Sequence, residues 1–248
     1  MVLAILQARC SSHRLPNKVL KPLLGRAMVL REMERLTHSR YIDRLVLATS
    51  TDVSDDPLCA LAKETGVNIY RGNLDDVLDR YYACAKEYGA EHIVRVTGDC
   101  PLIDWRVSDD VIARHLTEKN DYTHTTERFP DGLDTEVMTF AALAQAHREA
   151  QLTSEREHVT LYFRNHPERF RTGDVDCAED YRDLRWTVDE PCDFAFVEAV
   201  YEKLYANNKD FSMQDILSLL KEQPDLRALN QGIVRNEGLL KSLAEDTK

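Results

Sequence analysis

The sequence contains no hydrophobic run that approaches the roughly 20 residues of a membrane-spanning helix. Its first ten residues, MVLAILQARC, lack the basic start of a signal peptide. The patterns H-E-x-x-H, G-x-S-x-G and G-x-x-x-x-G-K-S/T are also missing, so zincin, nucleophile-elbow and P-loop chemistry have no support. We therefore expect neither a membrane partner nor one of these common catalytic centres.

Cysteine is sparse and scattered along the chain. The six cysteines include no C-x-x-C pair and no Cys/His cluster. A structural zinc site needs such a cluster, and a disulfide framework is typical of short secreted chains. Neither is expected here, and the spacing favours reduced thiols in a cytoplasmic protein.

Positive charge is in deficit. Lys and Arg total 32 against 43 Asp and Glu, which gives a net charge of −11. A field of this sign disfavours non-specific binding to nucleic acid or to an anionic membrane, so we expect neither as a partner. A local basic cluster can still serve one small anionic ligand.

Short apolar runs alternate with helical patterns over the first half of the chain. The runs at residues 2–6, 44–48, 67–70 and 92–96 are typical of buried strands. Between them, apolar residues recur at helical spacing, most fully from Leu74 to Ala85. This alternation predicts an α/β fold, with a doubly wound, mostly parallel sheet that has helices on both faces.

The regular alternation weakens beyond about residue 120. The turn signal Asp131-Gly132 separates YTHTT from LDTEVMTF, which predicts a small antiparallel excursion from the sheet. Residues 155–164 and 193–204 have the spacing of helices.

The pair Asn207-Asn208 marks a break before further helical segments. We expect one domain over residues 1–206, with the excursion at about 122–175 available for oligomer contacts. Residues 207–248 then form a helical C-terminal tail.

The loop after the first predicted strand is the first place to look for a ligand, because such sheets bind ligands beyond the carboxyl ends of their strands. This loop holds three cations, Arg9, Arg14 and Lys18, within ten residues. Arginine grips phosphate bidentately, and lysine adds a movable point charge. The loop therefore indicates a polyphosphate site, although a solvated basic loop is the plainer interpretation. We interpret His13 as an exposed loop residue in preference to a catalytic base.

Seven ordered motifs resemble those of the cytidylyltransferases that make CMP-activated acidic sugars, including the CMP-Kdo and CMP-sialate synthetases. The resemblance is strongest to the SpsF-like branch, the spore coat polysaccharide biosynthesis type, and covers at least residues 3–205. Relatives often have Gly-Ser where this chain has Ser11-Ser12, which leaves less room for a phosphate beside the backbone. The motifs are ILQARCSSHRLPNKVLKPLLG, VLATSTDVSDDPL, YRGNLDDVLDRYYACAKEYGA, VRVTGDCPLID, PDGLDTEV, SEREHVTLYF and LRWTVDEPCDF.

The resemblance implies a Rossmann-like sheet of the nucleotide-diphospho-sugar transferase type, a homodimer, and a nucleotidyltransferase domain at 1–206 with its acceptor side at about 122–175. It also implies CTP as the nucleotide and a set of site residues. The catalytic residues would be Arg9, Arg14, Lys18 and Asp99. The nucleotide would be bound by Gln7, Ala8, Arg9, Ser12, Arg14, Lys18, Arg71, Thr97 and Gly98.

Two aspartates are candidates for a Mg²⁺ site, since this ion takes oxygen ligands and few protein carboxylates. Asp99 follows a predicted strand in VRVTGDCPLID, and the resemblance implies that it is the metal-binding aspartate. Asp189 in WTVDEP precedes a predicted helix, where the resemblance implies a second metal contact. The plainer interpretations are a turn residue for Asp99 and a helix cap for Asp189.

The acceptor-binding residues are also implied by the resemblance. Asp134 and Glu136 lie in PDGLDTEV, which can equally be a solvated hairpin. The second group lies in the charged segment SEREH, which can equally be the surface of a helix, and Arg156 would pair with an acceptor carboxylate. Its members are Glu155, Arg156 and His158.

The sequence thus favours a CTP:acceptor cytidylyltransferase, with Mg²⁺ as cofactor and a small acidic acceptor as second substrate. A glycosyltransferase that uses a nucleotide-sugar donor is the alternative. Such an enzyme would be expected to have a D-x-D-like motif after a central strand, where this chain has Gly98-Asp99-Cys100-Pro101. A non-catalytic nucleotide-binding protein is a third interpretation. The identity of the acceptor, whether Kdo-like, sialic-like, legionaminic-like or a phosphonate, stays open.

Overall fold

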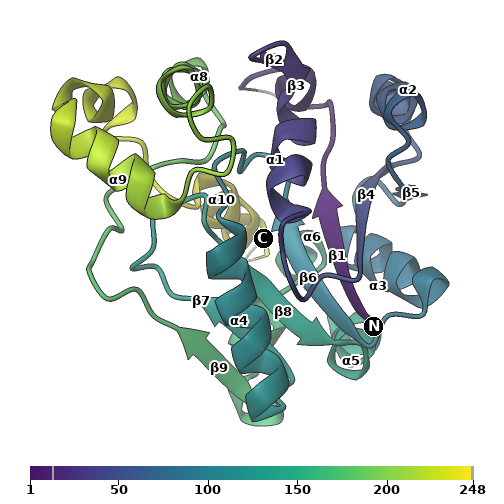
Figure 1. Cartoon of the computed structure of the whole chain (residues 1–248). Coiled ribbons are helices and arrows are strands. Elements are labelled where there is room, and N and C mark those ends of the chain that lie inside the picture. The colour runs from purple at the N-terminus through teal and green to yellow at the C-terminus, as the bar shows by residue number, and fades with distance from the viewer. Residues whose placement is uncertain (13, 247–248) are drawn as a thin grey trace.

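The computed structural model describes residues 1–12 and 14–246 and is drawn in Figure 1. The expectation for His13 lies outside the described residues. Among them, seven strands form one sheet in the order β5-β4-β1-β6-β8-β7-β9. Their bounds are β1 Val2–Gln7, β4 Arg44–Ser50, β5 Ile69–Gly72, β6 His92–Thr97, β7 Tyr122–Thr125, β8 Glu136–Thr139 and β9 Thr172–Val175.

Strand direction divides the sheet into two parts. Strand β1 pairs in parallel with β4 and with β6, and β5 extends this parallel part. Strand β8 runs antiparallel to β6 and β7, and β9 pairs in parallel with β7. The predicted doubly wound, mostly parallel α/β fold is confirmed, as is the antiparallel excursion. A two-stranded antiparallel sheet, β2 (Pro22–Leu23) with β3 (Arg26–Ala27), is a further feature that the sequence pattern does not indicate.

Helices cover both faces of the sheet. Leu3 and Ile5 of β1 pack into a core with α3 and α5, whereas Ala4 and Leu6 pack into a second core with α1, α2 and α4. Alternate residues of a strand point to opposite faces, so a strand buried on both sides is apolar throughout. Figure 1 shows α1 and α4 on the near side of the sheet. The bounds are α1 Met28–Leu36, α2 Asp56–Thr65, α3 Val77–Tyr88, α4 Trp105–Glu118 and α5 Phe140–Glu149.

A third core lies beyond the carboxyl ends of the parallel strands. It is built around Trp186 and joins α8 (Pro191–Leu204) to α9 (Met213–Glu222). The chain then passes through a 3-10 segment, η4 (Pro224–Asn230), and ends in α10 (Glu237–Glu245). Residues after 207 are therefore largely helical, and α9 packs against α8.

Two predicted helices have different bounds in the structure. The prediction of a single helix over residues 155–164 is wrong, because the structure divides this segment between α6 (Thr153–Glu157) and α7 (Leu161–Asn165). Val159, between them, has φ 52°, which a right-handed helix does not accept. The apolar stripe that begins at Leu74 enters a helix only at Val77, because the Asp76 side chain accepts a hydrogen bond from the backbone N–H of Asp79 and caps α3.

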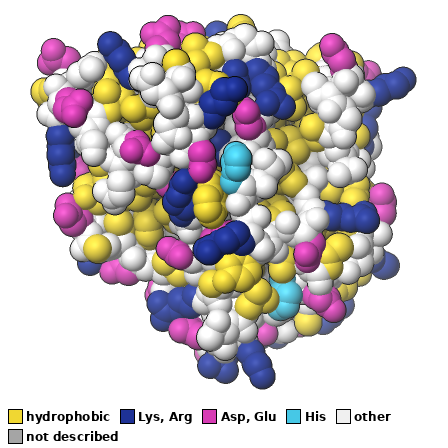
Figure 2. Space-filling view, viewed as in Figure 1, with side chains coloured by type: hydrophobic (Ala, Val, Ile, Leu, Met, Phe, Trp, Pro, Cys, Tyr) yellow, Lys and Arg dark blue, Asp and Glu magenta, His cyan; other side chains and the backbone are white. Residues whose placement is uncertain are grey.

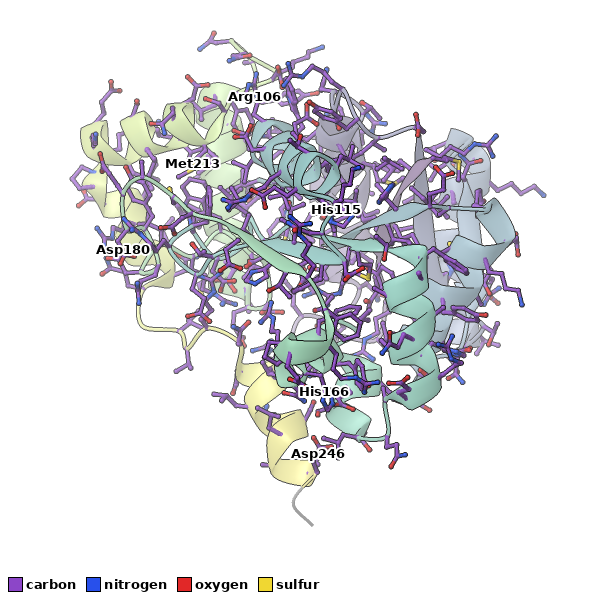
Figure 3. The ribbon with its side chains drawn as sticks, turned by 90° about the horizontal axis from the view of Figure 1, so that it is seen from below. Arg106, His115, His166, Asp180, Met213 and Asp246 are labelled. Carbon is purple, nitrogen blue, oxygen red and sulfur yellow. The ribbon has the colours of Figure 1, made fainter. Side chains whose placement is uncertain are left out.

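Three short 3-10 segments complete the fold: η1 (Lys18–Leu20), η2 (Val53–Asp55) and η3 (Pro167–Arg169). Helix α10 packs against α6, and Figure 3 shows it ending at Asp246. None of the helices in the described part of the chain is long and apolar enough to cross a membrane. On the face shown in Figure 2, acidic and basic side chains are interspersed.

Candidate active site

The first loop folds back on itself beyond the end of β1. The backbone N–H of Cys10 donates to Asp55 Oδ1 at 2.7 Å, which fixes the loop against the end of β4. The carbonyl of Cys10 accepts from the N–H of Asn17 at 3.0 Å, and Asn17 has φ 57°. This left-handed residue reverses the chain and directs Lys18, the first residue of η1, into the interior.

Lys18 joins the two acids that the sequence singles out. Its Nζ atom lies 3.2 Å from Asp99 Oδ2 and 2.9 Å from Asp189 Oδ1, and it also donates to the carbonyl of Val188 at 2.7 Å. The two aspartates, 90 positions apart, thus share one ammonium group. The Lys18 side chain is only 11% exposed, so water screens this contact weakly.

The contact between Lys18 and Asp99 favours the charged form of each side chain. Burial lowers the pKa of Lys18, but the carboxylates of Asp99 and Asp189 outweigh that effect and raise it. Burial likewise raises the pKa of Asp99, but the Lys18 ammonium and a hydrogen bond from Thr97 outweigh it and lower the pKa. At neutral pH, Lys18 and Asp99 are therefore both ionised.

Gly98 allows the end of β6 to approach the end of β1. Its N–H donates to the carbonyl of Gln7 at 2.7 Å. A Cβ at this position would lie 2.8 Å from the Cβ of Ala8 and 3.0 Å from Leu6, so only glycine fits without a shift of one strand. This close approach brings Asp99, the next residue, beside the first loop.

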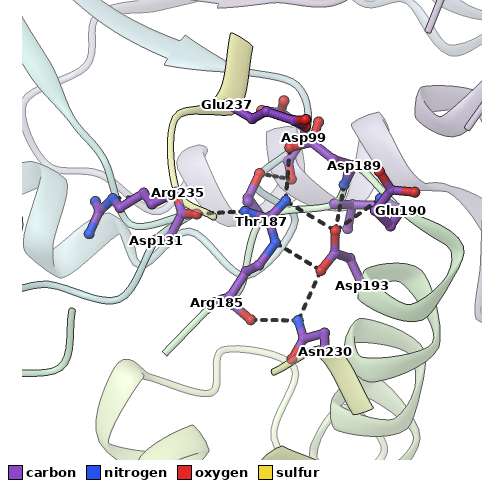
Figure 4. A network of polar contacts seen from close by, with 12 residues as sticks. Asp99, Asp131, Arg185, Thr187, Asp189, Glu190, Asp193, Asn230, Arg235 and Glu237 are labelled. Atoms are coloured by element: carbon purple, nitrogen blue, oxygen red, sulfur yellow. Dashed lines mark hydrogen bonds and ion pairs between the residues drawn. The ribbon is translucent and has the colours of Figure 1, made fainter. Parts of the chain in front are cut away.

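Asp189 is fixed from its other side by Arg185. The Arg185 guanidinium contacts Asp189 Oδ2 at 2.9 Å, Asp131 Oδ2 at 2.8 Å and Asp193 Oδ1 at 3.0 Å (Figure 4). Asn230 Nδ2 donates to Asp193 at 3.0 Å and completes the network. Asp193 also forms a capping box at the start of α8, so the network ties the Asp189 carboxylate to a helix end.

Asp131 is the acid of this network with a strongly raised pKa. Burial and the nearby charge of Asp134 raise the pKa of Asp131 to about 7, against the opposing effect of Arg235 and Arg185. The turn that holds it packs closely on the chain near Trp186: Gly132 has φ 108°, and a Cβ there would lie 2.6 Å from the backbone nitrogen of Thr187. The Asp131-Gly132 turn is thereby held against the segment that leads to Asp189.

Two adjoining cavities meet at the paired aspartates. The first, here called the loop cavity, has a volume of about 430 Å³ and is lined by the first loop. The second, the turn cavity, has a volume of about 550 Å³ and is lined by the segment around the Asp131-Gly132 turn. Arg14, Asp99 and Asp189 line both, so a molecule in one cavity can meet a molecule in the other beside these residues.

Most residues predicted to bind the nucleotide line the loop cavity. Arg71 does not: its guanidinium donates to the carbonyls of Ser50 and Asp52 and pairs with Asp56 at 2.8 Å. The position of Arg71 therefore does not support the predicted contact with the nucleotide. The residues that do line the loop cavity are Gln7, Ala8, Arg9, Ser12, Arg14, Lys18, Thr97 and Gly98.

The residues predicted to bind the acceptor divide into two groups. Asp134, Glu136 and His158 line the turn cavity. Glu155 and Arg156 do not: Glu155 is buried and accepts a hydrogen bond from Asn165 Nδ2 at 2.9 Å.

Arg156 is occupied by contacts within the fold. Its guanidinium lies 2.6 Å from Asp76 and donates to the carbonyls of His147 and Ala150. Asp76 is the N-cap of α3, so Arg156 ties α6 to the start of that helix. The acceptor contact expected of Arg156 is therefore not supported by its position.

Sequence reasoning missed four arginines that line the turn cavity. Arg95 was detectable, since it lies two residues before Thr97 on the same face of β6 and alternation places both side chains together. The other three are Arg164, Arg185 and Arg235. Arg185 stands in the motif LRWTVDEPCDF, four residues before Asp189, whereas no pattern in the sequence points to Arg164 or Arg235.

Glu32 is a further buried acid behind the site. Its Oε2 accepts from the backbone N–H of Cys100 at 3.1 Å, which holds the turn that follows Asp99 against α1. Burial and the neighbouring charge of Asp99 raise the pKa of Glu32. The sequence offers no sign of this role, because a glutamate in a predicted helix is most often exposed.

Helix α10 and the segment before it contribute residues to the walls of both cavities. Glu237 Oε2 accepts from Arg14 Nη1 at 2.6 Å, and Arg235 Nη2 lies 2.8 Å from Asp134 Oδ1. Further along, Ser242 Oγ lies 3.0 Å from His158 Nε2. The C-terminal helix thus contacts residues of both predicted sites.

The described residues contain no group of three or more His, Cys, Asp and Glu side chains arranged to hold a metal ion. Asp99 and Asp189 provide two carboxylates that already converge on one cation, the Lys18 ammonium. Two carboxylates completed by substrate phosphates and water are a usual Mg²⁺ site. The oxygen donors present therefore fit Mg²⁺.

A mostly parallel α/β sheet with a cationic loop beyond its first strand, and paired carboxylates where two cavities meet, defines the class: a nucleotidyltransferase. The family described as Cytidylyltransferase matches residues 3–221, and the chain belongs to this family. The predicted resemblance to SpsF-like and CMP-Kdo-type enzymes is confirmed.

Three similar proteins illustrate the relationship. The spore coat polysaccharide biosynthesis protein SpsF of Bacillus subtilis is 34% identical over 90% of this chain and 95% of its own. The 3-deoxy-manno-octulosonate cytidylyltransferase of Geobacter sulfurreducens is 28% identical over 93% of this chain and 88% of its own. The solved structure of a cytidylyltransferase from Leptospira borgpetersenii has a TM-score of 0.88 at 30% identity, over 94% of this chain and 99% of that one.

Proposed function

We propose that this protein transfers CMP from CTP to an acidic sugar or a related acidic acceptor and releases pyrophosphate, for surface polysaccharide or glycoconjugate synthesis. The observation that supports this most directly is the contact of Lys18 with both Asp99 and Asp189 where the two cavities meet. In this proposal, CTP occupies the loop cavity and the acceptor occupies the turn cavity.

The first loop would bind the triphosphate. Arg9, Arg14 and Lys18 line the loop cavity and supply three positive charges, which suits the roughly four negative charges of a nucleoside triphosphate. Ser12 adds a hydroxyl at the same wall. Arg14 contacts Glu237 and Asp189 in the structure, so phosphate binding requires it to exchange at least one carboxylate for a phosphate oxygen.

A Mg²⁺ ion held by Asp99 and Asp189 would neutralise charge on the reacting phosphate and orient the attacking oxygen. Arg185 holds the Asp189 carboxylate in place, and Lys18 holds both carboxylates close together. These contacts prepare the site before substrates arrive, which is how positioning and preorganised electrostatics contribute to phosphoryl transfer.

The reaction itself needs an acceptor oxygen to attack the α-phosphorus as the bond to pyrophosphate breaks. Arg14 and Lys18 would offset the negative charge that grows on the leaving pyrophosphate. If the nucleophile is already a carboxylate, phosphate or phosphonate oxygen, no proton has to be removed. If it is a sugar hydroxyl, its proton passes to solvent or to an acid that lines the turn cavity.

Two further expectations belong to this proposal. We place the reaction in the cytoplasm, since the six cysteines are free thiols and CTP is an intracellular substrate. We also keep the homodimer implied by the resemblance, which sedimentation or light scattering would measure.

One assay tests the proposed function. Purified protein is incubated with CTP, Mg²⁺ and a panel of acceptors that includes 3-deoxy-manno-octulosonate, and pyrophosphate release is measured. Release that depends on both CTP and an acidic acceptor supports the proposal. Turnover of a nucleotide-sugar without pyrophosphate would favour a glycosyltransferase, and nucleotide binding without any turnover would favour a non-catalytic protein.

A further inference from the structure

Three side chains from separate elements form a charged cluster in the wall of the turn cavity. Arg95 of β6 and Glu136 of β8 are cross-strand partners, and Arg95 Nη1 donates to Glu136 Oε2. Arg164 of α7 donates to Glu136 Oε1 through Nη2 at 3.0 Å. Tyr122 of β7 also donates its hydroxyl to Glu136. One carboxylate therefore holds two guanidinium groups side by side.

The cluster has a net positive charge that does not vary near neutral pH. Burial raises the pKa of Glu136, but Arg95 and Arg164 outweigh that effect and lower the pKa to about 2. His158, which lines the same cavity, has its pKa lowered by burial and by these two arginines. With Glu136 ionised and His158 neutral, two guanidinium groups face one carboxylate, which leaves one positive charge.

One hydrogen-bond donor of the cluster is left without an acceptor in the described part of the chain. The Nε atom of Arg95 is buried and has no hydrogen-bond partner among the described residues. A buried donor without a partner costs free energy, and a charged one costs more. Arg164 engages Glu136 through a single terminal nitrogen, and its side chain is 44% exposed in the cavity wall. An arginine has five N–H donors, so both side chains can still bind an anion.

The other arginines of the turn cavity are differently placed, because carboxylates outnumber or match them. Arg185 contacts three aspartates, and Arg235 contacts Asp131 and Asp134. Arg14 contacts Asp189, Glu190 and Glu237. In the described wall of this cavity, the Arg95–Glu136–Arg164 cluster is the place where guanidinium groups are in excess.

The cluster is also close enough to the paired aspartates to act on the same small molecule. Arg95 and Thr97 lie on one face of β6, about 7 Å apart along the strand, and Asp99 follows just beyond the strand end. Arg95, Thr97 and Asp99 all line the turn cavity. A monosaccharide-sized acceptor can thus present one group to the paired aspartates and another to the cluster.

We propose that Arg95 and Arg164, held together by Glu136, form the subsite that binds the anionic group of the acceptor, a carboxylate or a phosphate. This inference rests on the proposed function, which supplies the acceptor. Arg95 and Arg164 take the role that the family resemblance implied for Arg156, the recognition of the acid group. The subsite makes the enzyme selective for acidic over neutral acceptors of the same shape.

The variant that tests the proposal is Arg164→Gln, because Arg164 is partly exposed and its loss leaves Glu136 paired with Arg95. With the acidic acceptor that gives most pyrophosphate, we expect KM for the acceptor to rise at least about tenfold, the loss of one charge-assisted hydrogen bond. KM for CTP stays within about twofold. Arg164→Lys should recover part of the loss, whereas the control Arg114→Gln, at an exposed pair with Glu118, should behave as the wild type.

A second measurement does not depend on knowing the acceptor. With the loop cavity saturated by CTP, the Nε–H signals of Arg95 and Arg164 are followed by NMR as inorganic phosphate or acetate is added. Saturable shifts in the wild type that weaken in Arg164→Gln support the subsite, and the anion with the tighter response identifies phosphate or carboxylate as its ligand. Absence of saturable shifts with both anions would overturn the proposal.

The two proposals fail in distinguishable ways. Anion binding at Arg164 without pyrophosphate release from any acceptor contradicts the proposed function and leaves the subsite standing. Pyrophosphate release by Arg164→Gln with an unchanged acceptor KM contradicts the subsite and leaves the proposed function standing. A thermal unfolding curve of Arg164→Gln that matches the wild type shows that a loss is not due to misfolding.

Discussion

Arg14 and Glu237, which are 223 positions apart in the sequence, form a contact of 2.6 Å at the boundary between the loop cavity and the turn cavity. Arg14 belongs to the first loop, and Glu237 begins the C-terminal helix α10. A carboxylate and a phosphate are both anions that bind a guanidinium. Glu237 therefore holds the cation that we propose for the triphosphate of CTP.

The first prediction follows from this competition. Glu237→Gln removes one of the three carboxylates that contact Arg14, so CTP no longer has to displace that one. The pair is partly exposed, and such pairs contribute at most about 1 kcal/mol, so the dissociation constant of CTP should fall by up to about fivefold. Calorimetric titration with CTP measures it. The control is Glu245→Gln, which lies on the same helix and the same cavity wall but away from Arg14. Weaker CTP binding by Glu237→Gln would contradict the proposed competition between Glu237 and CTP.

The second prediction concerns the paired aspartates. Asp99→Asn should lower kcat by at least about 100-fold, because it removes a charged ligand from the proposed Mg²⁺ site and one partner from Lys18. The dependence of the rate on Mg²⁺ concentration should shift to higher concentrations as well. Asp75→Asn, at an exposed position outside both cavities, serves as the control. Pyrophosphate release by Asp99→Asn at the wild-type rate would refute the role of Asp99.

The third prediction concerns the close approach of β1 and β6. Gly98→Ala places a Cβ 2.8 Å from that of Ala8 and must move one strand end, at a cost of about 1 to 3 kcal/mol in the free energy of unfolding. Because Asp99 moves with the strand end, activity should fall further than the loss of stability alone would explain. Urea unfolding and the pyrophosphate assay measure the two effects. The control is Gly238→Ala, where a Cβ meets nothing within 4 Å, and it should not lower stability. If Gly98→Ala had the stability and activity of the wild type, the strand ends would not be tightly packed.

The fourth prediction is a pH dependence of stability that arises far from the site. His115 of α4, labelled in Figure 3, is buried, with Nε2 lying 3.1 Å from His92 and Nδ1 lying 3.2 Å from Thr123. Burial and the charge of His92 lower the pKa of His115 from 6.5 to about 4. Between these pH values the unfolded chain binds the proton more tightly, so stability falls as the pH decreases from 6.5 to 4.

The size of this effect follows from the pKa shift. At roughly 1.4 kcal/mol per pKa unit, His115 accounts for at most about 3 kcal/mol of lost stability. His115→Gln should flatten the stability profile in this range, as measured by urea unfolding at several pH values, whereas exposed His38→Gln should not. Asp131, with its pKa raised to about 7, acts in the opposite direction, so the difference between variant and wild type isolates the histidine. An unchanged profile for His115→Gln would refute the assignment.

The sequence predicted the main sheet well because burial leaves a local signature. Strand β1 is apolar at every buried position, and α1 and α3 repeat apolar residues at helical spacing, so each element is legible within its own segment. The prediction of a single helix over residues 155–164 was wrong because it used the same local signal. The apolar spacing is helical throughout this segment, and no side chain indicates the left-handed backbone of Val159.

The sequence by itself determined that the chain alternates strands and helices, that three cations follow the first strand, and that aspartates stand just beyond two apolar runs. Only the tertiary structure decided which charges meet: that Lys18 lies between Asp99 and Asp189, that Arg164 in place of Arg156 faces the turn cavity, and that Glu237 returns to Arg14. The physical reason is that secondary structure follows from periodic burial of nearby residues. The partner of a charged side chain depends instead on where the whole sheet brings distant strand ends together.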